Sequence, residues 1–215
     1  MRYETERREV AYFMRRLYAM GLTTTSGGNI SMKVAQTEFL VTPSATDKAR
    51  TRGHQLVLVS DDGSVMEGTL KPSIETMAHL LVYKVRPEVQ AVVHAHPTAL
   101  SAFAATGAVI NTRLLSESYA ILGTPAYVDY HTMGTSDLAA AISQAAISAD
   151  CILMRNHGAL AAGRTILEAF DRLEVFEAAA KVSMLASIGA LAGLGAEISH
   201  DKLHAIDQIM GRQKN

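Results

Sequence analysis

Three histidines and one glutamate are the side chains of this chain best suited to do chemistry. His94 and His96 are two residues apart at the end of an apolar run, with Glu75 upstream and His157 downstream. Because alternate side chains of a β-strand share a face, both imidazoles of a strand at 91–96 can point at one spot. With His157 and Glu75 they complete the donor set of a catalytic zinc site, in which nitrogen and oxygen ligands leave one position open for substrate. The same donors also suit manganese, iron or cobalt.

Each of these residues also has an ordinary structural explanation. A lone histidine is most often satisfied by one hydrogen bond, and an acidic residue at the start of a helix is favoured by the helix dipole. The combination of all four favours a metal site. The remaining histidines lack this context and are expected to be structural or peripheral: His54, His79, His131, His200 and His204. His79 lies four residues after Glu75 on the same helical face, so it is also a candidate to support that carboxylate.

Apolar spacing and turn residues predict the elements that must position these groups. We expect helices at 6–20, 74–85, 100–105, 137–146, 165–192 and 200–210, and strands at 30–34, 38–41, 56–59, 91–96, 124–129 and 151–154, with 159–162 as a hairpin partner of the last. Ser73 is expected to cap the helix that begins at Ile74. Intermixed strands and helices of this kind favour one sheet with helices packed on its faces. The pattern leaves open whether the strands are parallel or antiparallel.

Three short polar loops are candidates to bind an anion. They contain Gly27-Gly28-Asn29, Thr42-Pro43-Ser44-Ala45 and Pro72-Ser73-Ile74. Backbone N–H groups and Ser or Asn side chains in such loops suit a phosphate, and a helix beginning near Ser73 would direct its positive end at that phosphate. Ordinary turn chemistry explains each loop equally well when it is taken alone. No Walker pattern and no G-x-G-x-x-G occurs, which disfavours nucleotide binding.

Composition limits the class of protein. The 215 residues are enough for one large domain, and we treat 1–215 as that domain. A net charge of -1 gives no general affinity for nucleic acid or acidic membranes. No stretch has the uninterrupted apolar length of a membrane span, and the charged N-terminus lacks the apolar core of a signal peptide. Because Cys151 is the only cysteine, no internal disulfide can form, and we expect cytoplasmic residence.

Taken together, the motifs resemble those of the class II aldolase/adducin family. The motifs concerned are Gly28-Asn29-Ile30-Ser31, Val41-Thr42-Pro43-Ser44, Lys71-Pro72-Ser73-Ile74-Glu75, Ala91-Val92-Val93-His94-Ala95-His96-Pro97 and Asn156-His157-Gly158. They follow one another in the order and approximate spacing of that family, and the resemblance extends from the first helix to beyond Gly163. It implies an α/β class fold, a single three-layer α/β/α domain with a central, largely antiparallel sheet. It also implies a zinc-dependent homotetramer with fourfold symmetry.

The resemblance further implies roles for individual residues. His94, His96 and His157 fall on the zinc ligands, and Glu75 falls on the carboxylate that is both a ligand and the catalytic acid/base. The positions that bind phosphate are Gly28, Asn29, Ser44, Ala45, Ser73 and Ile74. Two of these depart from the usual pattern: Ile74 stands where a second serine is common, and Ala45 where glycine is common. Tyr119 lies in the region that contains a catalytic tyrosine in the aldolases, although a tyrosine that only packs is the alternative.

The implied activity is reversible cleavage of a phosphorylated ketose, similar to fuculose 1-phosphate, to dihydroxyacetone phosphate and an aldehyde. Zinc would stabilise the enediolate, and Glu75 would protonate its carbon. The fuculose enzyme uses a tyrosine near its C-terminus, whereas this chain has none after Tyr130. That difference weakens the assignment to fuculose phosphate more than the assignment to aldolase chemistry.

Other branches of the family offer alternatives at the same site. They include a dehydratase, an epimerase and decarboxylases that act on sugar phosphates. Glu75 disfavours the epimerase, where aspartate is expected, and the decarboxylases, some of which have lysine there. A non-enzymatic interaction domain, as in the adducin head, lacks the metal ligands, so the intact set of three histidines and Glu75 argues against that reading.

Overall fold

An eight-stranded sheet forms the centre of the structure, with the strand order β4-β3-β2-β1-β5-β8-β7-β6. This computed structural model describes residues 1–191 and 197–212. The strands are β1 (Asn29–Ala35), β2 (Glu38–Val41), β3 (Val57–Ser60), β4 (Val65–Glu67), β5 (Ala91–Ala95), β6 (Ala126–Val128), β7 (Cys151–Met154) and β8 (Gly158–Gly163). Neighbouring strands pair antiparallel except β6 and β7, which are parallel. The prediction of a largely antiparallel sheet is confirmed.

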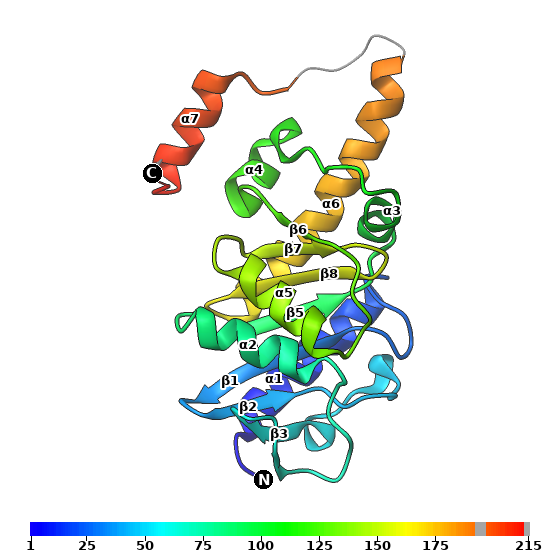
Figure 1. Ribbon diagram of the computed structural model, residues 1–215, viewed down its shortest axis with the longest axis vertical. Helices are drawn as coiled ribbons and strands as arrows, with labels where there is room; N and C mark the ends of the chain where they lie inside the picture. Colours follow the sequence, from blue (N-terminus) through cyan, green and yellow to red (C-terminus); the bar gives the residue numbers. More distant parts are fainter. Residues whose placement is uncertain (192–196, 213–215) are drawn as a thin grey trace.

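Helices cover both faces of this sheet (Figure 1). The α-helices of the described residues are α1 (Glu4–Ala19), α2 (Thr76–Val85), α3 (Thr98–Thr106), α4 (Ser116–Leu122), α5 (Ser136–Ala146), α6 (Ile166–Leu191) and α7 (His200–Ile209), with single 3-10 turns η1 (Lys48–Arg50), η2 (Gly53–Gln55) and η3 (Thr112–Leu114). One hydrophobic core joins α1, α3 and α6 to the sheet, and a second joins α2 and α5 to the other face. These two cores confirm the predicted three-layer α/β/α arrangement. None of the described helices combines the length and apolarity that crossing a bilayer would need.

The first helix is held against the sheet by an apolar stripe and by its N-terminal end. Val10, Phe13, Met14 and Leu17 recur at helical spacing, and all four are buried. Burial of side chains of this size stabilises the fold by about 1.5–3 kcal/mol each. The apolar spacing also placed Tyr18 on this stripe, but Tyr18 is 38% exposed, so the predicted stripe is confirmed for the other four residues only.

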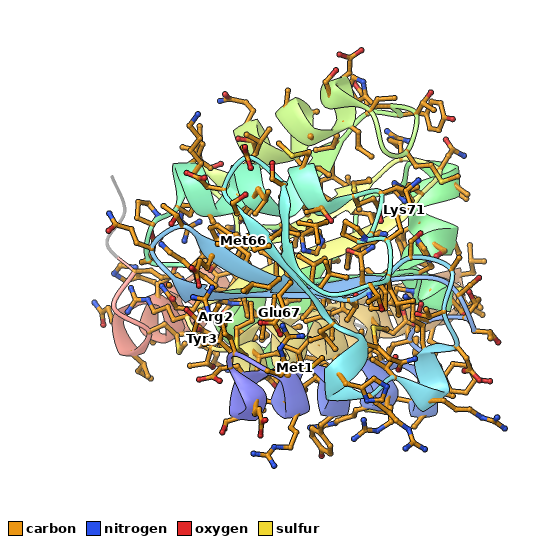
Figure 2. The ribbon with its side chains drawn as sticks, turned by 90° about the horizontal axis from the view of Figure 1, so that it is seen from below. Met1, Arg2, Tyr3, Met66, Glu67 and Lys71 are labelled. Atoms are coloured by element: carbon orange, nitrogen blue, oxygen red, sulfur yellow. The ribbon has the colours of Figure 1, made fainter. Side chains whose placement is uncertain are left out.

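Polar contacts anchor the residues that precede and begin this helix. The Arg2 backbone N–H donates to Glu67 at 3.4 Å, and both residues are labelled in Figure 2. The Tyr3 hydroxyl donates to Glu38 at 2.6 Å, and Arg2 pairs with the same carboxylate. The buried guanidinium of Arg7 donates to Glu67 at 3.1 Å. These bonds join the start of α1 to β2 and to the edge strand β4.

Several predicted boundaries differ from the observed ones. α2 begins at Thr76, two residues later than predicted, because Ser73 and Glu75 form a turn in which the Ser73 hydroxyl accepts from the Glu75 N–H at 3.3 Å. Ser73 therefore does not cap the helix as expected, and Glu75 takes the capping position. β4 and α4 were not predicted, because β4 is mostly exposed and α4 is only two turns long. The predicted end of the long helix at Ala192 lies outside the described residues.

Glu177 connects α6 to the first turn of α3. Its carboxylate is 3% exposed and accepts from the N–H groups of Ala99 at 3.1 Å and Leu100 at 2.9 Å. Those N–H groups have no partner within their own helix, and a carboxylate also favours the positive end of the helix. Since α3 begins two residues after His96, Glu177 determines the direction in which the chain leaves β5.

Replacement of Glu177 by alanine should lower the free energy of unfolding by about 3 kcal/mol, because two buried N–H groups lose a charged acceptor. Chemical denaturation monitored by circular dichroism measures this change. Glu174→Ala is the matched control on the same helix: that carboxylate is 37% exposed and lies 3.4 Å from Arg16, so its loss should cost less than about 1 kcal/mol. Equal effects of the two variants would contradict the assigned role of Glu177.

Candidate metal centre

Four segments distant in sequence meet at one end of the sheet. His94 is the fourth residue of β5, where it pairs with Asn29 of β1 on one side and Leu160 of β8 on the other. His96 follows two residues later. His157 lies in the turn between β7 and β8, and Glu75 directly precedes α2. The antiparallel order β1-β5-β8-β7 places the start of β1, the end of β5 and this turn at the same end of the sheet.

The side chains of these four residues converge. The Nε2 atoms of His94 and His96 are 3.0 Å apart. The Glu75 carboxylate has one oxygen 3.2 Å from His94 Nε2 and the other 3.0 Å from His157 Nε2. One ring nitrogen from each histidine lies within 4.8 Å of the others. The structure therefore brings together all four residues that the sequence singled out.

The protonation states of these groups favour a cation at the centre. His94 Nδ1 lies 2.9 Å from the carbonyl oxygen of Ala159, which can only accept, so Nδ1 holds the hydrogen and the Nε2 lone pair faces the cluster. Burial lowers the pKa of His94 and lowers that of His96 to about 3, so both rings are neutral at neutral pH. Burial alone would raise the pKa of Glu75, but hydrogen bonds from His157 and Asn29 hold that pKa below its usual value.

A divalent metal ion fits this donor set. An ionised carboxylate 3.2 Å from an imidazole lone pair is repulsive unless a cation lies between them. Three imidazoles and one carboxylate are typical ligands of zinc and of several neighbouring transition metals. Histidines that bind a metal usually donate their other ring N–H to a carbonyl or carboxylate, which fixes the orientation of the ring. The hydrogen bond from His94 Nδ1 to the Ala159 carbonyl is of this kind. The residues present are therefore suited to hold such an ion.

Behind the cluster, buried polar side chains hold Glu75 and α2 in place. The Asn29 amide donates to Glu75 Oε2 at 2.7 Å. The predicted phosphate contact of Asn29 stays a prediction, and in this structure its amide is bonded to the carboxylate. His79, on the next turn of α2, is buried and bonds through Nδ1 to the Ser31 hydroxyl at 2.8 Å, which in turn bonds to Tyr83 at 2.7 Å. Burial lowers the pKa of His79 to about 3, so it supports α2 as a neutral ring.

Two glycines allow the backbone to approach this cluster closely. A Cβ at Gly28 would lie 2.8 Å from the His94 carbonyl oxygen, and the φ of +67° at this residue is one that other residues resist. A Cβ at Gly158 would lie 2.6 Å from the His96 ring and 2.5 Å from the Ala95 carbonyl oxygen. Side chains at either position would push His94 or His96 away from the other ligands.

The two remaining predicted phosphate loops lie side by side. Pro43 and Pro72 form an isolated β-bridge, and the Ser44 N–H donates to the Lys71 carbonyl at 2.9 Å. Because that N–H is occupied, Ser44 can offer a phosphate its hydroxyl but not its backbone. Ala45 has a φ of +51°, in the left-handed region that glycine adopts more readily than alanine. The loops join Glu75 through Ser73, which is buried, whereas Ile74 is exposed.

Tyr119 is placed apart from the four converging residues. It lies on α4, which packs against α6, α7 and η3 rather than against α2 (Figure 1). Its hydroxyl donates to Asp207 of α7 at 2.9 Å, and burial together with Asp207 raises its pKa. The structure therefore does not bring Tyr119 to the histidines within one protomer. Local sequence position could not show this, because the direction of α4 depends on its packing.

Comparison with known proteins identifies the family. The family described as Class II Aldolase and Adducin N-terminal domain matches residues 8–184. The chain therefore belongs to the class II aldolase and adducin family, as its motifs predicted.

Three relatives illustrate what the chain is similar to. The 5-deoxy-D-ribulose 1-phosphate aldolase of Bacillus thuringiensis serovar kurstaki is 33% identical over 186 residues, which are 85% of this chain and 85% of that protein. The 3-oxo-tetronate 4-phosphate decarboxylase of Haemophilus influenzae is 30% identical over 172 residues, 78% of this chain and 81% of that protein. A solved structure of L-fuculose 1-phosphate aldolase superposes with a TM-score of 0.86 at 26% identity, covering 98% of both chains. All three names describe lyases that act on phosphorylated compounds, and this similarity supports the assignment of this chain to the lyases.

Proposed function

We propose that this chain is a zinc-dependent aldolase that reversibly cleaves a phosphorylated ketose to dihydroxyacetone phosphate and an aldehyde. The observation that supports it most directly is the convergence of His94, His96 and His157 on the Glu75 carboxylate, with ligand atoms 3.0–3.2 Å from that carboxylate for two of the rings. Manganese, iron or cobalt suits the same donors. A fuculose 1-phosphate-like ketose is the proposed substrate class, with the phosphate near Gly28, Ser44, Ala45 and the Ser73 turn.

In this proposal the metal supplies a Lewis acid that stabilises negative charge developing on the substrate oxygens. Glu75 transfers a proton to and from the substrate carbon at which the bond breaks. When the carbon–carbon bond breaks, its electron pair stays on the carbon next to the carbonyl, and that carbon takes a proton from Glu75. Because Glu75 is ionised in the free protein, it must gain a proton before it can give one to the carbon. The hydroxyl oxygen that becomes the aldehyde releases one proton in the same turnover, so no net proton is consumed. Asn29, which donates to Glu75 at 2.7 Å, keeps the carboxylate aimed at the reacting carbon.

A second group must accept the proton from the hydroxyl that becomes the aldehyde, and Tyr119 is our hypothesis for that group. Because α4 places Tyr119 apart from the histidines of its own protomer, this role requires that Tyr119 leave Asp207 and reach the site of another protomer. Tyr119→Phe removes the hydroxyl while keeping the ring. If Tyr119 acts on the substrate, this variant should lower kcat without lowering metal content.

A homo-oligomer, most simply a tetramer, is part of the same proposal. The outer half of α6 presents large exposed side chains, including Leu185 at 63%, Ile188 at 62% and Leu191 at 91% exposure. Such a row of apolar side chains is typical of a surface that another chain covers. Light scattering of the purified protein measures the mass directly, and a monomer at micromolar concentration would contradict this part of the proposal.

A decarboxylase is the second candidate, because the Haemophilus influenzae decarboxylase is 30% identical to this chain. A dehydratase or an epimerase would leave the carbon skeleton intact. The deciding experiment incubates the zinc-loaded protein with a panel of ketose 1-phosphates and sugar-acid phosphates and identifies every product. Release of dihydroxyacetone phosphate supports the aldolase. Carbon dioxide, a diketone or an epimer in its place would assign the site to the corresponding alternative.

A further inference from the structure

A lysine is buried directly behind one of the two neighbouring polar loops. Lys48, the first residue of η1, is 1% exposed. Its Nζ donates to the Pro43 carbonyl at 2.7 Å and lies 3.5 Å from the Thr46 hydroxyl. Its backbone N–H donates to the Thr25 carbonyl at 2.9 Å, which ties it to the segment leading to Gly28. The ammonium group is therefore placed beneath the loop that contains Ser44 and Ala45.

This ammonium has no anionic partner in the described part of the chain. The adjacent Asp47 accepts from the Ala49 N–H at 3.0 Å and pairs with Arg50 at 3.5 Å. On α1, the helix packed against η1, the positively charged Arg15 donates to the Thr51 carbonyl at 2.6 Å. A buried charge with only neutral acceptors is costly, because it has lost its hydration without gaining an ion pair. Burial accordingly lowers the pKa of Lys48 to about 8.

The loop above Lys48 has features that suit a doubly charged anion. Thr46 and Lys48 both donate to the Pro43 carbonyl, so the loop is held from below. Ala45 keeps a left-handed backbone that alanine disfavours, which indicates that the loop conformation is imposed. The Ser44 N–H donates to the Lys71 carbonyl, and Lys71 is two residues before the buried Ser73.

We propose that Lys48 is a positioning residue for substrate phosphate, supplying from beneath the Pro43–Thr46 loop the positive charge that makes this loop prefer a phosphate dianion. This inference rests on the proposed function, because it assumes that the substrate phosphate lies at these loops. It assigns to the site a residue that lies outside the sequence motifs. Lys48 acts through the loop and need not touch the phosphate.

A dianion bound above Lys48 has a measurable consequence. It favours the charged ammonium, so the pKa of Lys48 rises on binding. At about pH 8.5 roughly three quarters of Lys48 is neutral in the free protein, and binding should take up a comparable fraction of a proton. A phosphate monoester is already a dianion at that pH, since its second pKa is near 6, so the ligand itself takes up none.

The test is isothermal titration of the full-length, zinc-loaded protein with glycerol 3-phosphate at about pH 8.5. Titrations in two buffers of different ionisation enthalpy give the proton uptake. Lys48→Met should weaken binding about tenfold or more and should remove the part of the proton uptake that is due to Lys48. It should also raise KM for a phosphorylated ketose more than it lowers kcat. Arg50→Met, which removes an exposed charge two residues away, should change affinity less than about twofold.

The results separate this inference from the proposed function. If wild-type protein with bound zinc does not bind glycerol 3-phosphate, the phosphate site itself is wrong and the inference falls with it. If wild type binds and Lys48→Met binds equally well with the same proton uptake, the inference alone is overturned. If the wild type takes up no more protons than Lys48→Met, the inference is also overturned. If Lys48→Met fails to fold, the wild-type titration decides alone, and absence of any proton uptake by the wild type overturns the inference.

Discussion

His96→Ala should abolish metal binding and reduce carbon–carbon cleavage by about 10³-fold or more. A protein binds a catalytic metal much more weakly when one of the residues that coordinate it is removed. Loss of a residue that only supports a ligand already lowers metal affinity or activity about 10–100-fold. His96 is the informative choice among the three because it is partly exposed and follows β5, whereas His94 is buried within that strand. Its removal should therefore disturb the metal more than the fold.

Metal content per protomer, measured by mass spectrometry after dialysis, is the primary readout of this prediction. His54→Ala is the matched control, because His54 is exposed on η2 and has no contact with the cluster. Wild type treated with a chelator should lose activity to the same extent and should regain it when zinc is added. Full activity of dialysed His96→Ala would mean that the reaction does not depend on the proposed metal centre.

Glu75→Gln should lower cleavage by about 10²–10⁴-fold, the usual contribution of a positioned general acid or base. The substitution keeps the shape of the side chain and replaces one carboxylate oxygen by an amide, so the fold should change little. The variant loses the negative charge near His94 and His157, so some loss of metal affinity is also expected. Assays at saturating zinc separate the two effects, because restored occupancy cannot restore the proton transfer.

The single-turnover rate at full zinc occupancy is the measurement for Glu75. Glu174→Gln, an exposed carboxylate on α6, is the control for a generic loss of charge. Exchange of the carbon-bound proton of dihydroxyacetone phosphate with deuterated water gives a second readout, since this step involves Glu75 but not the aldehyde. Undiminished exchange and cleavage in Glu75→Gln would remove Glu75 from the mechanism.

Local patterns were sufficient to predict most of the elements near the site. Short continuous apolar runs located β5 and β7, and the hairpin of β7 with β8 was expected from the segment after Gly158. β4, α4 and the three 3-10 turns were missed, because exposed or short elements have weak periodicity. The start of α2 was misplaced by two residues, since the Ser73 turn that delays it depends on contacts that a helix-capping rule does not include.

The chain by itself specified which residues are chemically competent: the imidazoles at 94, 96 and 157, the carboxylate at 75, and the small residues that flank them. These choices follow from side-chain chemistry and strand period, which are local properties. Only the tertiary structure decided that Asn29 serves Glu75, that Tyr119 faces Asp207, and that Lys48 lies buried beneath the Pro43–Thr46 loop. Those outcomes depend on strand order and on which helix covers which face of the sheet, and both are set by long-range packing that no local pattern records.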